Sequence, residues 1–148
     1  MTRTWLHVGL PLITGSSIYA LWRSPALLGF EWLEAVGASR SVLQLRAAGD
    51  AAGHVLPSWI VFSLPNGLWS YALMASIGLL WRTERWTNAK QFWFWCTLCI
   101  AVLPEVGQAM HLIPGTFDLV DLVNCLVGSS VAVGLVWPCR SREIRCAR

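Results

Sequence analysis

Four long apolar stretches occupy most of this 148-residue chain, and they limit its possible folds more than any other feature. They cover approximately residues 5–22, 59–81, 91–113 and 118–137. Each is close to the ~20 residues that a helix needs to cross the hydrocarbon of a bilayer. A helix pairs its own backbone groups, so it crosses hydrocarbon without leaving them unsatisfied. The sequence therefore predicts an all-α fold, an integral membrane four-helix bundle in which residues 1–148 form a single four-span transmembrane domain.

The charged residues are too few for an ordinary soluble domain. They make up 13% of the chain, whereas soluble domains carry about 25%. The formal charge of +3 comes from arginines near the ends of the stretches, which does not indicate nucleic-acid binding. Tryptophans, which anchor helices at headgroup depth, mark several ends: Trp5, Trp22, Trp59, Trp81, Trp86, Trp93 and Trp137. The expected partner is the lipid bilayer, and no nucleic acid is expected.

The distribution of basic residues predicts the orientation. They follow the second and fourth stretches, at Arg82, Arg85 and Lys90 and then at Arg140, Arg142, Arg145 and Arg148. Lysine and arginine collect on the cytoplasmic side, so both termini are expected in the cytoplasm of a multi-pass inner (plasma) membrane protein. Arg23, Arg40 and Arg46 in the first loop argue the other way, but they are mixed with acidic residues. The link between the third and fourth stretches then faces outside.

The first loop, Pro25 to Pro57, is too polar to span. Two apolar patterns in it predict one or two interfacial helices on the outer side. The first runs from Leu27 to Val36, and the second has Ser39 as its N-cap and carries Val42, Leu43 and Leu45. These helices are either a lid or an external loop without a function.

The second stretch should break early, at Leu64-Pro65-Asn66-Gly67. The proline removes a backbone donor and the glycine loosens the turn. Backbone freed at membrane depth has to be covered by protein or water. The break lies at the level of the acidic residues described next, which favours a polar cavity there.

Acidic and amide residues lie within the last two stretches. A charge at the bilayer centre costs ~2.5–3.5 kcal/mol on insertion scales, so such residues usually pair, line a wet cavity or bind a ligand. Glu105 follows a proline and shares a helix face with Gln108 and roughly with His111, while Asp118, Asp121 and Asn124 repeat a three-residue step on the last stretch. A Pro114-Gly115 turn should bring the two faces together in a tight hairpin. The predicted ligand-binding residues are Glu105, Gln108, Asp118, Asp121, Asn124, His54 and His111; no metal ligand set or cofactor is predicted, and no catalytic residue is assigned.

Each of these residues also has a purely structural interpretation. Asp118 fits a helix N-cap, with Asp121 as the acid of a capping box. Gln108 and Asn124 fit interhelical hydrogen bonds, and His111 fits an interfacial belt. Glu105 is the hardest to explain structurally, because no basic residue lies near it in the sequence.

The segment from Glu105 to Gly128 resembles the VanZ-like family of small bacterial membrane proteins. The resemblance rests on an E-x-x-Q motif, a Pro-Gly turn, an acid-rich helix start and a D…N…G pattern, here Glu105, Gln108, Pro114, Gly115, Asp118, Asp121, Asn124 and Gly128. The family usually has an arginine after the turn, where this chain has Thr116. The resemblance implies a membrane protein of the cell envelope, in a family associated with low-level glycopeptide (teicoplanin) resistance.

Three functions remain open. The first is a binding or accessory role in the envelope, in which an outward-facing acidic and amide pocket engages a polar headgroup, an amide or a cation. The second is an intramembrane enzyme in which Glu105 and Asp121 act as acid and base or hold a metal. The third is a structural subunit of a larger membrane complex. The corresponding partners are a lipid-linked envelope component or other membrane protein subunits.

Overall fold

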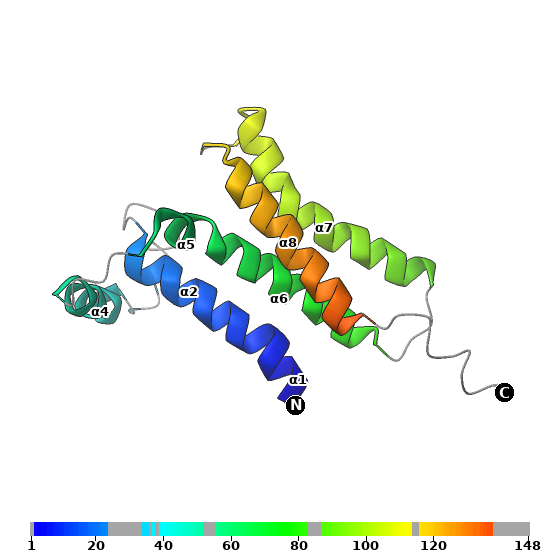
Figure 1. The fold of residues 1–148 in the computed structure, drawn as a ribbon, viewed down its shortest axis with the longest axis horizontal. Coiled ribbons are helices and arrows are strands. Elements are labelled where there is room, and N and C mark those ends of the chain that lie inside the picture. Colours follow the sequence, from blue (N-terminus) through cyan, green and yellow to red (C-terminus); the bar gives the residue numbers. More distant parts are fainter. Residues whose placement is uncertain are drawn as a thin grey trace.

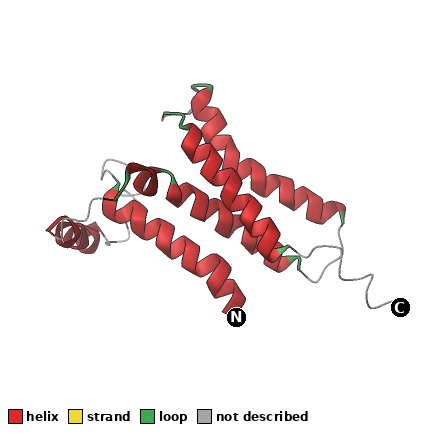
Figure 2. Cartoon of the chain, viewed as in Figure 1, coloured by secondary structure: helices red, strands yellow, loops and turns green. Residues whose placement is uncertain are grey.

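The computed structural model describes residues 2–23, 34–35, 37, 39–51, 56–82, 87–113 and 116–137, and within these ranges it is helical without strands (Figures 1 and 2). The predicted all-α class is confirmed. The elements are α1 (Thr2–Thr4), the π-helical turn η1 (Trp5–Gly9), α2 (Leu10–Trp22), α4 (Ser39–Ala51), α5 (Ser58–Phe62), α6 (Leu64–Leu80), α7 (Asn88–Ala109) and α8 (Leu119–Val136).

Three helical segments are long and apolar enough to cross a membrane: Ser58–Leu80, which joins α5 and α6, then α7 and α8. They coincide with the second, third and fourth predicted stretches. The first stretch is the run α1, η1 and α2, from Thr2 to Trp22. The start of α1, the end of α6, the start of α7 and the end of α8 lie at one end of the molecule (Figure 1). The other end, called the acid end below, holds the end of α7 and the start of α8.

A proline explains the π turn in the first run. Pro11 has no N–H, so it cannot donate to the carbonyl of His7, and its ring would crowd that oxygen in an α-helix. The structure widens the helix here, and the N–H of Leu10 donates to the carbonyl of Trp5, five residues back. Gly15, four residues after the proline, lies against Trp69. If another residue replaced the glycine, its Cβ would be 2.9 Å from Nε1 of Trp69. The run therefore packs closely on α6 despite its irregular start.

The predicted break in the second stretch is confirmed, but it lies one residue earlier, at Ser63 between α5 and α6. Pro65 belongs to the first turn of α6, where a missing N–H costs nothing because that donor has no helical partner. Gly67 is fully inside α6. Its role is in packing and not in loosening the chain.

The most extensive contact between helices joins α6 and α8. Gly128 of α8 lies directly against the Gly67 carbonyl oxygen, so that a Cβ at Gly128 would collide with it. A Cβ at Gly67 would in turn lie 3.0 Å from the backbone oxygen of Asn124. Small residues allow such backbone contact between helices, and the contact supplies the van der Waals energy that holds them together.

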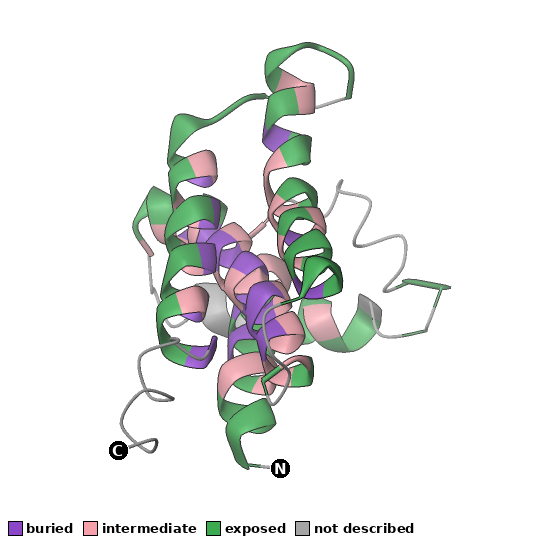
Figure 3. Ribbon diagram, turned by 90° about the vertical axis from the view of Figure 1, so that its right-hand side faces the viewer, coloured by how far each residue is buried: buried purple, intermediate pink, exposed green. Residues whose placement is uncertain are grey.

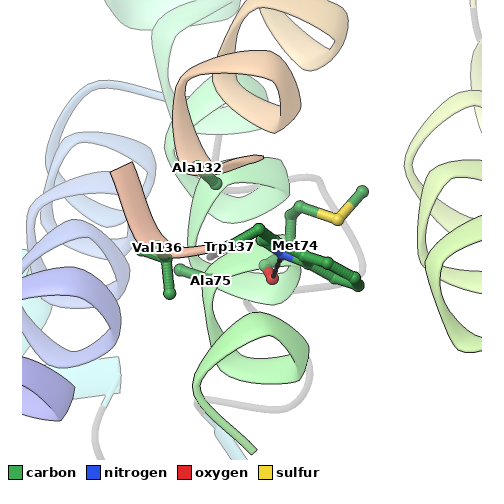
Figure 4. Packing of buried hydrophobic residues seen from close by; sticks show 5 residues of the cluster. All are labelled: Met74, Ala75, Ala132, Val136 and Trp137. Atoms are coloured by element: carbon green, nitrogen blue, oxygen red, sulfur yellow. Dashed lines mark hydrogen bonds between the residues drawn. The ribbon is translucent and has the colours of Figure 1, made fainter. Parts of the chain in front are cut away.

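The end of α8 opposite the acid end is fixed by a small apolar core. Met74, Ala75, Ala132, Val136 and Trp137 pack there, and the Trp137 indole N–H donates to the Met74 carbonyl at 3.2 Å (Figure 4). Lys90, which the sequence places beside a loop, is buried here. Its Nζ donates to the Trp81 carbonyl at 2.8 Å and lies 5.5 Å from the Trp137 ring centroid.

α7 is the least buried of the three long segments (Figure 3). Among its residues Lys90, Thr97 and Glu105 are buried. Its exposed side chains are mostly large and apolar: Phe92, Trp93, Trp95, Ile100, Leu103 and Val106. α7 and α8 contact each other, but the predicted hairpin of the last two stretches is less tightly packed than expected, because α8 packs chiefly on α6.

The first loop contains the second predicted helix, α4, which begins at Ser39 as expected. Arg46 ties it to the end of α2 by donating to the carbonyls of Ala20 at 3.0 Å and Arg23 at 2.6 Å. These are end carbonyls that lack a helical donor, and a cation is favoured there by the helix dipole. Most of the first predicted piece, Leu27 to Val36, lies outside the described residues.

The α6–α8 contact predicts different costs for two glycines of the same helix. Gly128→Ala should destabilise the fold by about 1–3 kcal/mol, because the added methyl group forces two backbones apart. Gly134→Ala is the matched control, since nothing lies within 4 Å of a Cβ there, and it should be neutral or stabilising by up to ~1 kcal/mol. Unfolding of both variants in detergent, followed by tryptophan fluorescence, measures the difference. Equal stabilities would contradict the packing.

Candidate functional site

The acid end contains a buried carboxylate–amide pair between α8 and α6. Asp121, in the first turn of α8, is 9% exposed. The side-chain amide of Asn66 donates from Nδ2 to Oδ2 of Asp121 at 2.9 Å. Asn66 is in the first turn of α6, just after the break at Ser63. The break and the glycine contact together place this pair.

Glu105 brings a second buried acid from α7. Its side chain is 6% exposed and lies close to the backbone N–H of Asp118. It also lies near enough to Asp118 and Asp121 to interact with both electrostatically. Three of the predicted site residues, Glu105, Asp118 and Asp121, are therefore together in the structure.

The start of α8 is capped by Asp118. Its side chain accepts from the N–H of Val120 at 2.8 Å, which confirms the predicted N-cap. In a capping box the acid at Asp121 would accept from the N–H of Asp118. Here the Asp121 carboxylate accepts from Asn66 of α6 instead, and Glu105 of α7 lies close to the N–H of Asp118. Asp121 therefore joins α8 to α6.

Two carboxylate oxygens in this cluster have no hydrogen-bond donor. They are Oε2 of Glu105 and Oδ1 of Asp121, both buried. A buried acceptor without a partner costs about 1–3 kcal/mol, and more when it is charged. The two oxygens come from different helices and share one region. We call Asn66, Glu105 and Asp121 the acid cluster; it can accept hydrogen bonds from a ligand that carries N–H or O–H donors or a positive charge.

A polar layer continues below the acid cluster along the seam of α6 and α8. The buried Cys125 lies close to the side chain of Ser70 and near enough to both acids to interact with them electrostatically. One turn further, Oγ of Ser129 is buried without a partner. Sequence reasoning missed Asn66, Ser70 and Cys125. The available signal was a four-residue spacing of small polar side chains on each helix: Asn66 and Ser70, then Asp121, Cys125 and Ser129.

The other predicted site residues lie apart from these buried oxygens. Asn124 is half-buried and donates to the carbonyl of Val120 within its own helix at 2.9 Å. Gln108 is half-buried, one turn beyond Glu105. His111 is exposed in the turn that ends α7, with φ of +56° and its N–H on the Gln108 carbonyl. His54 lies outside the described residues.

Within the described ranges no group of three or more histidine, cysteine or acidic side chains is arranged to hold a metal ion. Cys96 and Cys99 of α7 are free thiols, and Cys99 is exposed. The chemistry of the site therefore rests on its carboxylates and amides.

Comparisons with known proteins give no further guide. The chain matches no protein-family model, and neither a curated protein nor a solved structure is significantly similar to it. The VanZ-like resemblance stays a prediction. The function is therefore argued from the site alone.

Proposed function

We propose that this chain is a four-span integral membrane protein. The three long apolar segments are three of the spans, and the run from Thr2 to Trp22 is the fourth. Support comes from the exposed apolar side chains that line every one of these segments, such as Leu10 and Ile13, Leu80, Leu103 and Leu135. In water such a surface would drive aggregation, whereas in a bilayer it faces lipid. A multi-pass protein of the plasma membrane follows.

The proposed orientation has both termini in the cytoplasm and the acid end outside. The start of α1 and the end of α8 lie at the same end of the molecule (Figure 1). In the sequence, basic residues follow the second and fourth spans, whose last helical residues lie at that end, and basic residues favour the cytoplasmic side. The acid cluster then lies at the depth of the outer headgroups.

Reporter fusions check this topology. Alkaline phosphatase, which is active only outside the cytoplasm, should be inactive when fused after residue 137 and active when fused in the link at residues 114–116. The opposite pattern would contradict the orientation. Activity of fusions at both sites would contradict the fourth span.

We propose further that the acid cluster binds a ligand carrying a cationic N–H donor. The observation that supports this is the pair of buried, unpartnered oxygens on Glu105 and Asp121. A single ammonium group placed between them would satisfy both acceptors and neutralise the charge that makes their burial costly. The VanZ-like resemblance adds the context of an envelope-associated binding or accessory role. No described contact favours the enzyme or the structural-subunit alternative over this one.

Ethylammonium chloride is a suitable probe, with tetramethylammonium chloride as its control. Both ions carry one positive charge, but the control has no N–H to donate. We expect ethylammonium to raise the thermal unfolding midpoint of the detergent-solubilised protein, by up to the equivalent of ~2.7 kcal/mol at a hundred times its Kd. Tetramethylammonium should have little effect at the same ionic strength. Equal responses to both ions would contradict specific binding.

Glu105→Gln separates a binding role from a structural one. The glutamine amide adds a donor beside Oδ1 of Asp121 and removes a buried like charge, so the ligand-free variant should be more stable than the natural protein. It should also lose the response to ethylammonium. Glu34→Gln, on an exposed side chain, is the matched control and should change neither property. A destabilised Glu105→Gln variant that still responds to ethylammonium would overturn the proposal.

A further inference from the structure

A half-buried cationic side chain, Arg23, lies near enough to Glu105 to interact with it electrostatically, and the binding role alone does not explain it. Arg23, immediately after α2, donates from one terminal nitrogen to the Phe62 carbonyl at 2.8 Å. Its guanidinium carbon lies 5.6 Å from the Tyr19 ring centroid and 5.1 Å from that of Phe62. Its Nε is buried and has no acceptor. One donor of a well-fixed guanidinium therefore remains unused.

Arg23 is placed by the same elements that place the acids. Phe62, which accepts from it, ends α5. Asn66, whose amide donates to Asp121, follows in the first turn of α6, after the break at Ser63. Arg23 also lies near enough to Glu105 to interact with it electrostatically. A fixed positive group and a pair of negative groups thus lie at the same end of the molecule.

The position of Arg23 is itself held from outside. Arg46 of α4 donates to the backbone carbonyls of Ala20 and Arg23, so the first loop fastens the end of α2. The backbone from which the Arg23 side chain extends is therefore fixed. A guanidinium held in this way offers several donors in one plane, which suit a phosphate.

We propose that the ligand of this site is a zwitterion with a primary ammonium and a phosphate, namely the headgroup of phosphatidylethanolamine in the outer leaflet. The ammonium donates to the free oxygens of Glu105 and Asp121, and the phosphate accepts from Arg23. This inference rests on the proposed binding role and adds the anionic half of the ligand. The acid end lies at headgroup depth in the proposed orientation, so a lipid reaches it without crossing the bilayer.

Mixed micelles of stated lipid composition test the inference. The purified full chain is titrated with phosphatidylethanolamine, phosphatidylcholine or phosphatidylglycerol, and the unfolding midpoint and lipid retention by native mass spectrometry are recorded. Phosphatidylcholine keeps the phosphate and the charge but has no N–H, and phosphatidylglycerol keeps the phosphate without an ammonium. We expect each to bind at least about tenfold more weakly than phosphatidylethanolamine, the effect of losing a charge-assisted hydrogen bond. Equal affinities for all three lipids would overturn the inference.

Substitution of Arg23 separates this inference from the proposed binding role. Arg23→Gln should lose about tenfold in affinity for phosphatidylethanolamine and keep its response to ethylammonium. Arg23→Lys, which keeps the charge but not Nε, should be intermediate and serves if the glutamine variant fails to fold. Arg40→Gln, on an exposed residue of α4, is the control and should bind as the natural protein does.

The outcomes have distinct meanings. If the Arg23 variants bind phosphatidylethanolamine as the control does while ethylammonium still stabilises the protein, the zwitterionic ligand is contradicted and the proposed binding of a cation at the acid cluster stands. If ethylammonium also does not stabilise the protein, both proposals are contradicted. Soluble phosphoethanolamine is the last control. If it stabilises the protein as strongly as the lipid does at equal concentration, the proposal that the ligand is a membrane lipid is contradicted.

Discussion

The backbone contact between α6 and α8 is the constraint on which the rest of the structure depends. Gly128 leaves room for the Gly67 carbonyl, and no side chain could be accommodated between the two backbones. In the proposed bilayer setting there would be no hydrophobic force between helices, so this close approach would supply much of the attraction. It also sets the distance at which a side chain as short as that of Asn66 reaches Asp121. Packing and site are therefore consequences of the same contact.

The site lowers the stability of a mostly apolar fold, because it buries hydrogen-bonding atoms without partners. Four hydrogen-bonding atoms of the described side chains are buried without partners, on Arg23, Glu105, Asp121 and Ser129, and three of these lie at the acid end. Packing alone does not require them, because an apolar side chain at Glu105 would avoid the penalty. Residues that lower stability in this way are typical of binding sites, where a ligand completes the hydrogen bonds. The proposed ammonium and phosphate contacts would complete three of the four.

Hydropathy and local chemistry predict the elements of this fold well. The last three apolar stretches correspond to helical segments of the expected length, and the interruption near Pro65 and the cap at Asp118 follow from single-residue rules. Each of these features is determined by residues that are close together in the sequence. The hairpin argument also predicts that Glu105 and Asp121 come together, as they do in the structure.

The contacts between helices could not be predicted in the same way. The face of α6 that meets α8 decides that Asn66 is a partner of Asp121 and that Asn124 bonds to its own helix. Overall hydropathy does not define that face, because most side chains of both helices are apolar and only the spacing of a few small polar residues marks it. Arg23 was classed with loop charges because its partner, the Phe62 carbonyl, is 39 residues away. His111 ends α7 in a left-handed turn, a role that glycine usually takes, so its ring gave a misleading signal.

A double-mutant cycle between Asn66 and Asp121 tests the central claim, that the α6–α8 contact holds an amide against a buried acid. The free energy of unfolding in bicelles is measured for Asn66→Ala, Asp121→Ala and the double variant. The structure predicts a coupling of about 1.5–3 kcal/mol, the strength of a hydrogen bond to a charged group. Asn88→Ala combined with Asp121→Ala, at an exposed site on α7, should be additive. An additive Asn66–Asp121 pair would contradict the account.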